Sequence, residues 1–222
     1  MKIARLAGLM VVAVMALSLA VASAAFGEAE FKPVGGTFTG KSSTTNKLVA
    51  GGNTITCSGN TTQGTISSAT LAGGVTVNFT GCKSSGTGGS NCTVKSVGGT
   101  AGSILTKTLH GVLGLILAKG SGTGVALDLL PVSGKTFVEI ASNTCTVETA
   151  VEGSVAGEIS PVGTLKTTGS LLFAPGTTGE SIKVIDLSTG GLIKPALEAF
   201  GLAASQETSE SLGFSGTGLE VT

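Results

Sequence analysis

Residues 125–159 read VALDLLPVSGKTFVEIASNTCTVETAVEGSVAGEI and decide the fold class. From Cys145 to Ile159 the odd positions are Cys, Val, Thr, Val, Gly, Val, Gly and Ile, whereas every glutamate stands at an even position. A helix would not keep the glutamates on one parity, but a strand with one buried and one solvated face does. The stretch therefore predicts an antiparallel β protein. It places three valines in the core and two glutamates in water: Val147, Val151 and Val155, and Glu148 and Glu152.

Short apolar runs separated by turn residues continue along most of the chain. About ten short strands of this kind are typical of a β-sandwich or a β-barrel, and the pattern leaves both open. The run 103–118 fits a helix or a strand, and Gly111 and Gly114 favour a strand because each costs about 1 kcal/mol in a helix relative to alanine. At most one short helix is expected, at 196–200 after a proline. The polar run 83–91, KSSGTGGSN, predicts a solvated loop.

The first residues have the order of a secretory signal peptide. Lys2 and Arg5 precede the apolar run 6–19, and Ala22-Ser23-Ala24 is a small-x-small cleavage site. The apolar run is shorter than the roughly 20 residues that a membrane-spanning helix needs, and no later run is long enough. We therefore expect residues 1–24 to be a signal peptide and residues 25–222 a single domain, secreted or held in the cell envelope.

Composition excludes several classes of function. The 13 basic and 13 acidic residues balance, so the clustered positive charge of a nucleic-acid-binding protein is not expected. Trp and Tyr are absent, which disfavours aromatic stacking platforms for sugars or bases. With 41% hydrophobic and 12% charged residues the chain should fold rather than stay disordered.

Four cysteines, an even number, predict two disulfides in an exported protein: Cys57, Cys82, Cys92 and Cys145. Three connectivities are possible. We favour Cys82–Cys92, which would close the polar loop, and Cys57–Cys145, whose members share the apolar parity of their strands. Zinc sites usually contain C-x2–4-C pairs, and the nearest pair here has nine residues between its members, so no metal and no cofactor are expected.

Candidate site residues are few. His110 is the single histidine, and Asp128 or a glutamate could orient it, but no G-x-S-x-G elbow supplies a nucleophile. Glu148 and Glu152 share one strand face, and paired carboxylates can act on sugars or hold calcium. A solvated strand face explains them more simply. These four residues are kept as possible ligand-binding groups, and no catalytic residue is assigned.

Several segments occur in one order that is similar to a set of exported bacterial proteins: ITCSG at 55–59, FTGC at 79–82, ILTKTLHGVLG at 104–114, VALDLLPVSG at 125–134 and VEGSVAGEISPVG at 151–163. Over residues 36–222 the chain resembles an uncharacterised Gly/Ser/Thr-rich family of actinobacteria. The resemblance implies secretion and a β fold. It implies no activity, so no functional residue is transferred from it.

The sequence favours a secreted, non-catalytic structural or interaction protein. Such a protein could be a component of the cell envelope or could associate with itself. The alternative is a binding module for a small ligand or a glycan, using loops at one end of the domain. A hydrolase comes third. The partner stays open at this stage.

Overall fold

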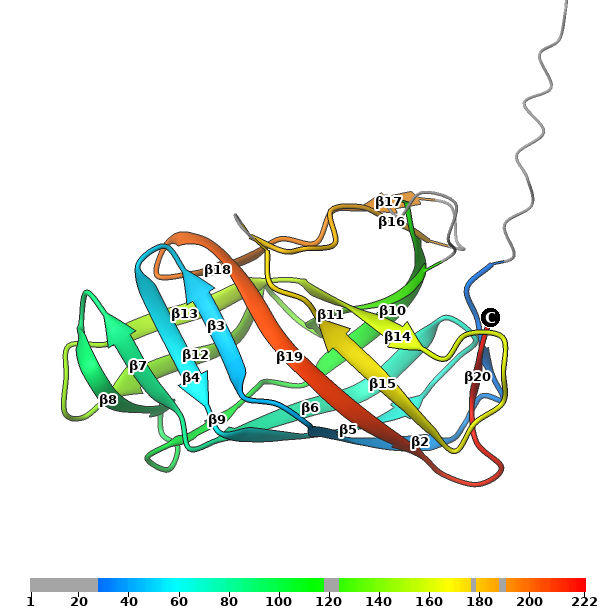
Figure 1. Cartoon of the computed structure of the whole chain (residues 1–222), viewed down its shortest axis with the longest axis horizontal. Helices are drawn as coiled ribbons and strands as arrows, with labels where there is room; N and C mark the ends of the chain where they lie inside the picture. Colours follow the sequence, from blue (N-terminus) through cyan, green and yellow to red (C-terminus); the bar gives the residue numbers. More distant parts are fainter. Residues whose placement is uncertain (1–27, 118–123, 177–178, 188–190) are drawn as a thin grey trace, which may run out of the picture.

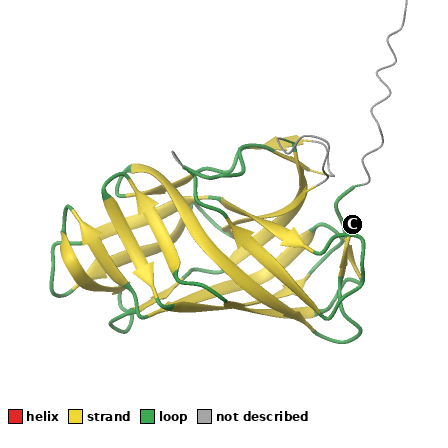
Figure 2. Cartoon of the chain, viewed as in Figure 1, coloured by secondary structure: helices red, strands yellow, loops and turns green. Residues whose placement is uncertain are grey.

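The computed structural model describes residues 28–117, 124–176, 179–187 and 191–222. Within these ranges every regular element is a strand, which confirms the all-β prediction (Figure 2). The segment 196–200, where the sequence admitted a helix, holds strand β18, in which exposed Glu198 separates two buried residues. The predicted signal peptide, 1–24, lies outside the described residues.

Eight strands form a closed antiparallel ring, so the barrel alternative is confirmed. We call this the first ring. In the order of their pairing, from β19 back to β19, its strands are β19 (Leu202–Phe214), β2 (Thr37–Ser42), β5 (Gly59–Ile66), β6 (Leu71–Thr80), β10 (Leu109–Ile116), β11 (Gly124–Pro131), β14 (Val155–Ser160) and β15 (Thr168–Phe173).

A second closed ring shares strand β19 with the first. Its strands, again from β19 to β19, are β3 (Asn46–Ala50), β4 (Asn53–Cys57), β7 (Lys83–Gly86), β8 (Gly89–Ser96), β12 (Thr136–Ser142), β13 (Glu148–Gly153) and β18 (Leu197–Ala199). Figure 1 shows the two rings end to end, with β19 running obliquely along both. The molecule is therefore one elongated barrel.

The remaining strands lie outside the two rings. They are β1 (Phe31–Lys32) paired with β20 (Glu220–Val221), β9 (Ser103–Leu105) paired with β6, and β16 (Ile185–Leu187), which pairs with β10 and with β17 (Gly191–Ile193). The strand segments outnumber the ten expected because many long strands bend and split where they pass from one ring to the other.

The stretch 145–159 shows how such a split arises. It was predicted as one strand, but it changes partners at Ser154: β13 pairs with β12 in the second ring and β14 with β11 in the first. Gly153 has φ +103°, and a Cβ on it would lie 1.9 Å from the carbonyl oxygen of Ala196. Only glycine fits there. The side-chain parity survives the bend, so Val147, Val151 and Val155 are all buried as predicted.

One hydrophobic core runs through both rings. Buried side chains of the second ring, such as Ile55 and Ile140, belong to the same cluster as Val75 and Leu113 of the first. The 103–118 run is strand as predicted, with β9 and β10 inside it, and its last residue lies outside the described ranges. One continuous apolar cluster thus fills most of the barrel interior.

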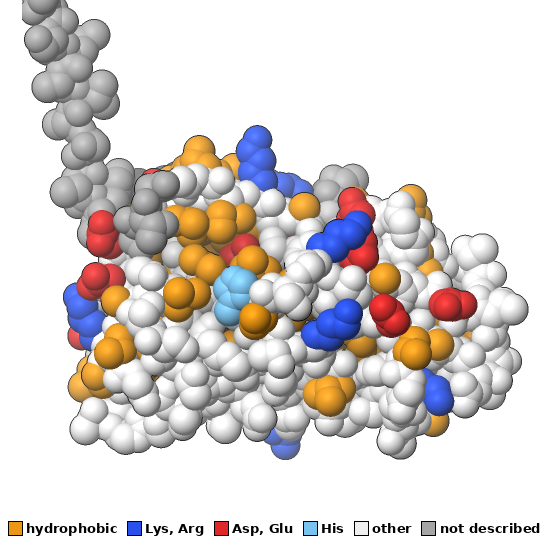
Figure 3. All heavy atoms as spheres, turned by 180° about the vertical axis from the view of Figure 1, so that it is seen from behind, with side chains coloured by type: hydrophobic (Ala, Val, Ile, Leu, Met, Phe, Trp, Pro, Cys, Tyr) orange, Lys and Arg blue, Asp and Glu red, His pale blue; other side chains and the backbone are white. Residues whose placement is uncertain are grey.

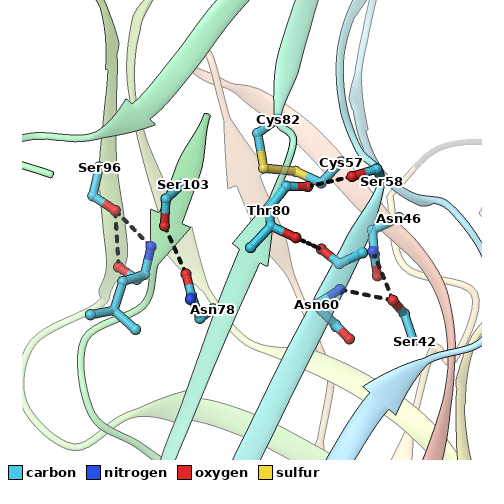
Figure 4. Close-up of a disulfide and its surroundings, with 12 residues drawn as sticks. Ser42, Asn46, Cys57, Ser58, Asn60, Asn78, Thr80, Cys82, Ser96 and Ser103 are labelled. Carbon is cyan, nitrogen blue, oxygen red and sulfur yellow. Dashed lines mark hydrogen bonds between the residues drawn. A yellow bond between two sulfur atoms is a disulfide. The ribbon is translucent and has the colours of Figure 1, made fainter. Parts of the chain in front are cut away.

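The predicted loop 83–91 is instead most of a hairpin, β7–β8, and this overturns the predicted disulfide pairing. The structure joins Cys57 to Cys82 and Cys92 to Cys145, and all four cysteines are bonded. Thr56 of β4 faces Lys83 of β7, so the next pair along this ladder is Cys57 and Cys82 (Figure 4).

Register also explains why Cys82 and Cys92 do not bond. Cys92 faces Ser84 in the β7–β8 ladder, two residues away from Cys82. Diagonal neighbours of this kind lie roughly 7–8 Å apart, beyond the Cα separation of about 4.4–6.8 Å that most disulfides have. The polar composition of residues 83–91 gave no sign of strand β7, and it is the pairing of this strand with β4 and β8 that decides which cysteines are neighbours.

Candidate ligand-binding cavity

A cavity of about 80 Å³ lies inside the barrel where the two rings meet. Residues of both rings line it, and most of them are apolar. Three phenylalanines from different strands contribute, together with aliphatic side chains: Phe79, Phe137 and Phe173, with Leu129, Ile140 and Val151. Phe137 and Ile140 come from β12, Val151 from β13 and Phe173 from β15, whereas Phe79 comes from β6 and Leu129 from β11.

Several polar groups at the cavity already have hydrogen-bond partners. Asn46 is buried, its Nδ2 donates to Oγ of Ser42 at 3.3 Å, and its Oδ1 accepts a hydrogen bond from Oγ1 of Thr208. Oγ1 of Thr106 accepts the backbone N–H of Val77 at 3.0 Å. Bonded in this way, these groups leave a wall that offers mainly apolar contacts.

Among the described residues that line the cavity, Glu210 is the one buried acid. Its Oε1 accepts a hydrogen bond of 2.5 Å from Nδ2 of Asn60. Its Oε2 lies 2.8 Å from the place where a Cβ on Gly40 would stand, so glycine on the neighbouring strand leaves room for the carboxyl. Burial raises the pKa of Glu210, and the hydrogen bond from Asn60 opposes that shift. The sequence contained a signal for this residue, because Glu210 shares the parity of buried Leu212.

The barrel wall is interrupted beside the cavity. Along β19, pairing with β15 ends at Thr208 and pairing with β18 begins at Ala204. Residues 205–207 therefore have no strand partner on that side among the described residues. On the opposite rim, residues 154–157 lie between the part of the strand that pairs with β18 and the part that pairs with β15. We call the space between these two rims the wall gap.

The wall gap leads towards the cavity. Val155, Phe173, Leu197 and Gln206 stand at its borders, and all four also line the cavity. In Figure 1 the chain leaves the wall after β15, runs over the outside to β16 and β17, and returns at β18. Strands β15 and β18 pair with successive parts of β19, but this long excursion separates them in the sequence, so they do not form one continuous strand.

Glu180, on this excursion, is buried at the wall gap. It is 3% exposed, and its Oε1 accepts the backbone N–H of Gln206 at 3.4 Å, on the unpaired rim of β19. Asp128 on β11 is 1% exposed, its Oδ1 has no hydrogen-bond partner among the described residues, and its charge adds to the rise in the pKa of Glu180. Burial raises the pKa of Asp128 to about 7 and that of Glu180 to about 8.

The four predicted ligand-binding residues do not form one site. His110 and Asp128 project from the outer faces of β10 and β11, and His110 faces Leu130 while Asp128 faces Val112. They are thus diagonal neighbours, a separation of roughly 7–8 Å. Asp128 is buried under the excursion, whereas His110 is half-buried at the surface.

Apolar side chains surround His110 on the outside of the barrel. Figure 3 shows hydrophobic groups gathered around the histidine. Leu130 is its cross-strand neighbour, and Val112, on the same face of β10, faces Leu71 of β6. Val132 follows at the end of β11 and is 60% exposed.

Glu148 and Glu152 lie on the second ring, far along the barrel from His110. Both border a shallow surface hollow with Glu198 of β18. Glu148 is exposed, while Glu152 accepts a hydrogen bond from Thr136 and pairs with Lys135 at 2.7 Å. The hydrogen bond and charge of Lys135 lower the pKa of Glu152. These contacts fit the solvated strand face that the sequence favoured.

Metal and membrane features are absent from the described part of the chain. No group of three or more His, Cys, Asp or Glu side chains there could hold a metal ion. None of its elements is a helix long and apolar enough to cross a membrane. Comparisons with protein-family models, with curated proteins and with solved structures find no match to this chain.

Proposed function

We propose that this protein is a non-catalytic binding protein that holds a small apolar molecule, or a slender apolar group of a larger one, inside the barrel. The observation that carries the proposal is the cavity between the rings, whose wall is mainly apolar and most of whose polar side chains have hydrogen-bond partners. Interior cavities of closed barrels are common places for one small ligand.

The volume limits the class of ligand. An engineered apolar cavity of about 150 Å³ stays dry and binds benzene or xenon. A cavity of about 80 Å³ suits a smaller group unless side chains move. We therefore place the ligand among compact hydrocarbons and short alkyl chains, held by burial of apolar surface at roughly 25 cal/mol per Å². Glycans are disfavoured because few unbonded polar groups face the cavity.

We also propose that the protein acts outside the cytoplasm, secreted or in the cell envelope. Two disulfides fit an oxidising compartment, and the predicted signal peptide leads to the same place. The alternative function that the sequence left open is a ligand held by loops at one end of the domain, whereas the cavity favours a ligand in the interior. A hydrolase is disfavoured because His110, Asp128 and the two glutamates do not converge.

A titration with benzene, followed by methyl and amide NMR, tests the proposal. Binding inside should shift the signals of Val151, Leu129 and Ile140. Phe137→Leu enlarges the cavity and should tighten benzene binding several-fold, whereas Val151→Phe fills it and should abolish binding. Exposed Leu192→Phe is the matched control and should bind like the wild type. Absence of cavity shifts in both the wild type and Phe137→Leu would refute interior binding.

A second candidate is the interaction protein that the sequence favoured. The exposed apolar side chains around His110 are the observation in its favour, because contiguous apolar surface often marks a contact site. Concentration-dependent shifts confined to Leu71, Leu130 and Val132, without added benzene, would support self-association through this face.

A further inference from the structure

We propose that the wall gap is the entrance through which a ligand reaches the central cavity. We also propose that the segment 179–187 closes this entrance, with the Glu180 carboxyl bound to the rim of β19. The proposal rests on the proposed function for what passes through the entrance. The closing of the gap by Glu180 stands on geometry alone and is tested separately below.

Backbone hydrogen bonds close another passage between the rings but do not close this one. Between β10 and β12, Lys107 donates to the carbonyl of Phe137 at 2.7 Å, and on the other side Thr106 donates to the carbonyl of Val77 at 3.0 Å. At the wall gap the rim amide of Gln206 takes a carboxyl side chain as its partner instead. Withdrawal of this side chain leaves the ladders of the two rings intact, because the strand pairs of the segment lie outside the rings, so this part of the wall can open at a lower cost than that passage.

The segment is held at β10, β17 and the rim of β19: Leu117 donates to the carbonyl of Val184 at 3.3 Å, and β16 pairs with β17 as well as with β10. Strand β16 forms three register pairs with the end of β10, from Gly114 to Ile116. Ile185 packs in a small cluster that is separate from the main core and contains Ala126 and Ala156. These alanines leave a shallow surface, and a Cβ on Gly114 would stand 2.2 Å from Cγ2 of Ile185. Docking of the segment thus depends on small residues beneath it.

The two buried acids make closure depend on pH. Burial favours the neutral form of both Glu180 and Asp128, and the charge of Asp128 raises the pKa of Glu180 further. When both ionise they repel each other and gain hydration by leaving the gap. The surrounding titratable and charged groups are Lys183 and Asp186 on the segment, Glu158 on β14, Glu207 on β19 and His110 on β10. Lys183 opposes the rise in the pKa of Glu180, but more weakly than burial raises it.

Closure is therefore favoured below pH 7, and opening increases as pH rises through about 7 to 8. Coupling to a single deprotonation changes the open population by at most about tenfold per pH unit. The same release would speed exchange between the cavity and the solvent.

The first experiment measures protection of the Gln206 amide against hydrogen exchange at pH 6 and pH 9, corrected for intrinsic exchange. Protection in the wild type should fall about tenfold or more, relative to Val94 on the second ring. Glu180→Gln keeps the size of the side chain without its charge. In this variant the protection of the Gln206 amide should change with pH no more than that of the Val94 amide. Exposed Glu148→Gln should behave like the wild type. Protection at Gln206 that tracks Val94 in the wild type would overturn the closure.

The second experiment measures the association rate of benzene with Phe137→Leu by NMR exchange. Adding Gly114→Val, which displaces Ile185 without touching Glu180, should raise the rate several-fold at pH 6. If benzene binds the cavity but its rate ignores both pH and Gly114→Val, the entrance is wrong and the proposed function stands. If benzene binds no variant, the proposed function fails, and the Gln206 measurement still decides whether Glu180 closes the gap.

Discussion

Asn60 on β5 hydrogen-bonds through Nδ2 to Oε1 of Glu210 on β19, at 2.5 Å and across Gly40 on the strand between them. Both side chains are buried, with exposed fractions of 3% each. The contact joins residues 150 positions apart in the chain, inside the first ring and beside the cavity. A buried polar pair of this kind fixes how the two strands lie relative to each other.

Asn60→Ala should lower the free energy of unfolding by about 1–3 kcal/mol, because it leaves the buried Glu210 carboxyl without its donor. Chemical denaturation measures the change. Thr61→Ala, on the exposed face of the same strand, is the control and should stay within about 0.5 kcal/mol of the wild type. Equal effects of the two changes would contradict the assigned network.

Val151→Asp should cost several kcal/mol, because it places an unpaired carboxylate in the apolar interior. Glu148→Lys, on the exposed parity of the same strand, should change stability by no more than about 0.5 kcal/mol. Urea denaturation of both variants provides the comparison. Glu152 is a poorer control than the alternation suggested, since it pairs with Lys135.

Non-reducing peptide mapping should recover Cys57 linked to Cys82 and Cys92 linked to Cys145. In the loop-entropy model each bridge contributes about 3–4 kcal/mol, so reduction should lower the denaturation midpoint clearly. A fragment linking Cys82 to Cys92 would contradict the β4–β7 register as well as the pairing.

Stability should fall as pH rises from about 4 to 8. The folded-state pKa values of Asp128 and Glu180, about 7 and 8, exceed their ordinary values of 3.8 and 4.5. Their contribution is therefore complete below pH 4 and is lost as pH passes through the folded-state values. The slope is at most about 1.4 kcal/mol per pH unit for each acid.

Asp128→Asn separates this effect from other titrations. The amide is neutral at every pH, so the variant should lose part of the slope and gain stability over the wild type at pH 8. Denaturation at pH 5, 6, 7 and 8 measures both. A wild-type protein that becomes more stable between pH 5 and pH 8 would rule out the buried neutral acids.

Side-chain parity was readable from the sequence, whereas strand partnership was not. The alternation around Val151 predicted correctly which residues face the core, because burial of one face acts residue by residue. The bend at Gly153 left that parity intact, so nothing in the pattern revealed that the strand passes from one ring to the other. The predicted cysteine pairing was wrong for a related reason. Disulfide pairing depends on strand register, and the unexpected strand β7 places Cys82 next to Cys57 instead of Cys92.

The candidate site was the least predictable part. Asp128 was singled out from an apolar run, and it is buried at the wall gap, but its neighbour Glu180 comes from a segment without clear alternation. Glu210 stands at an inward position among apolar neighbours, a signal that could have been used. The cavity itself depends on how two rings meet, and no local pattern encodes that.

Because β19 belongs to both rings, the barrel closes only when this one strand docks. Its partners β2 and β3 come from the opposite end of the sequence: Phe38 pairs with Phe214, and Ala50 with Ala204. Folding dominated by such distant pairings is slow. Until β19 arrives, β2, β3, β15 and β18 expose open strand edges to neighbouring chains. Aggregation during folding is thus most favoured before residues 202–214 pair with their neighbouring strands.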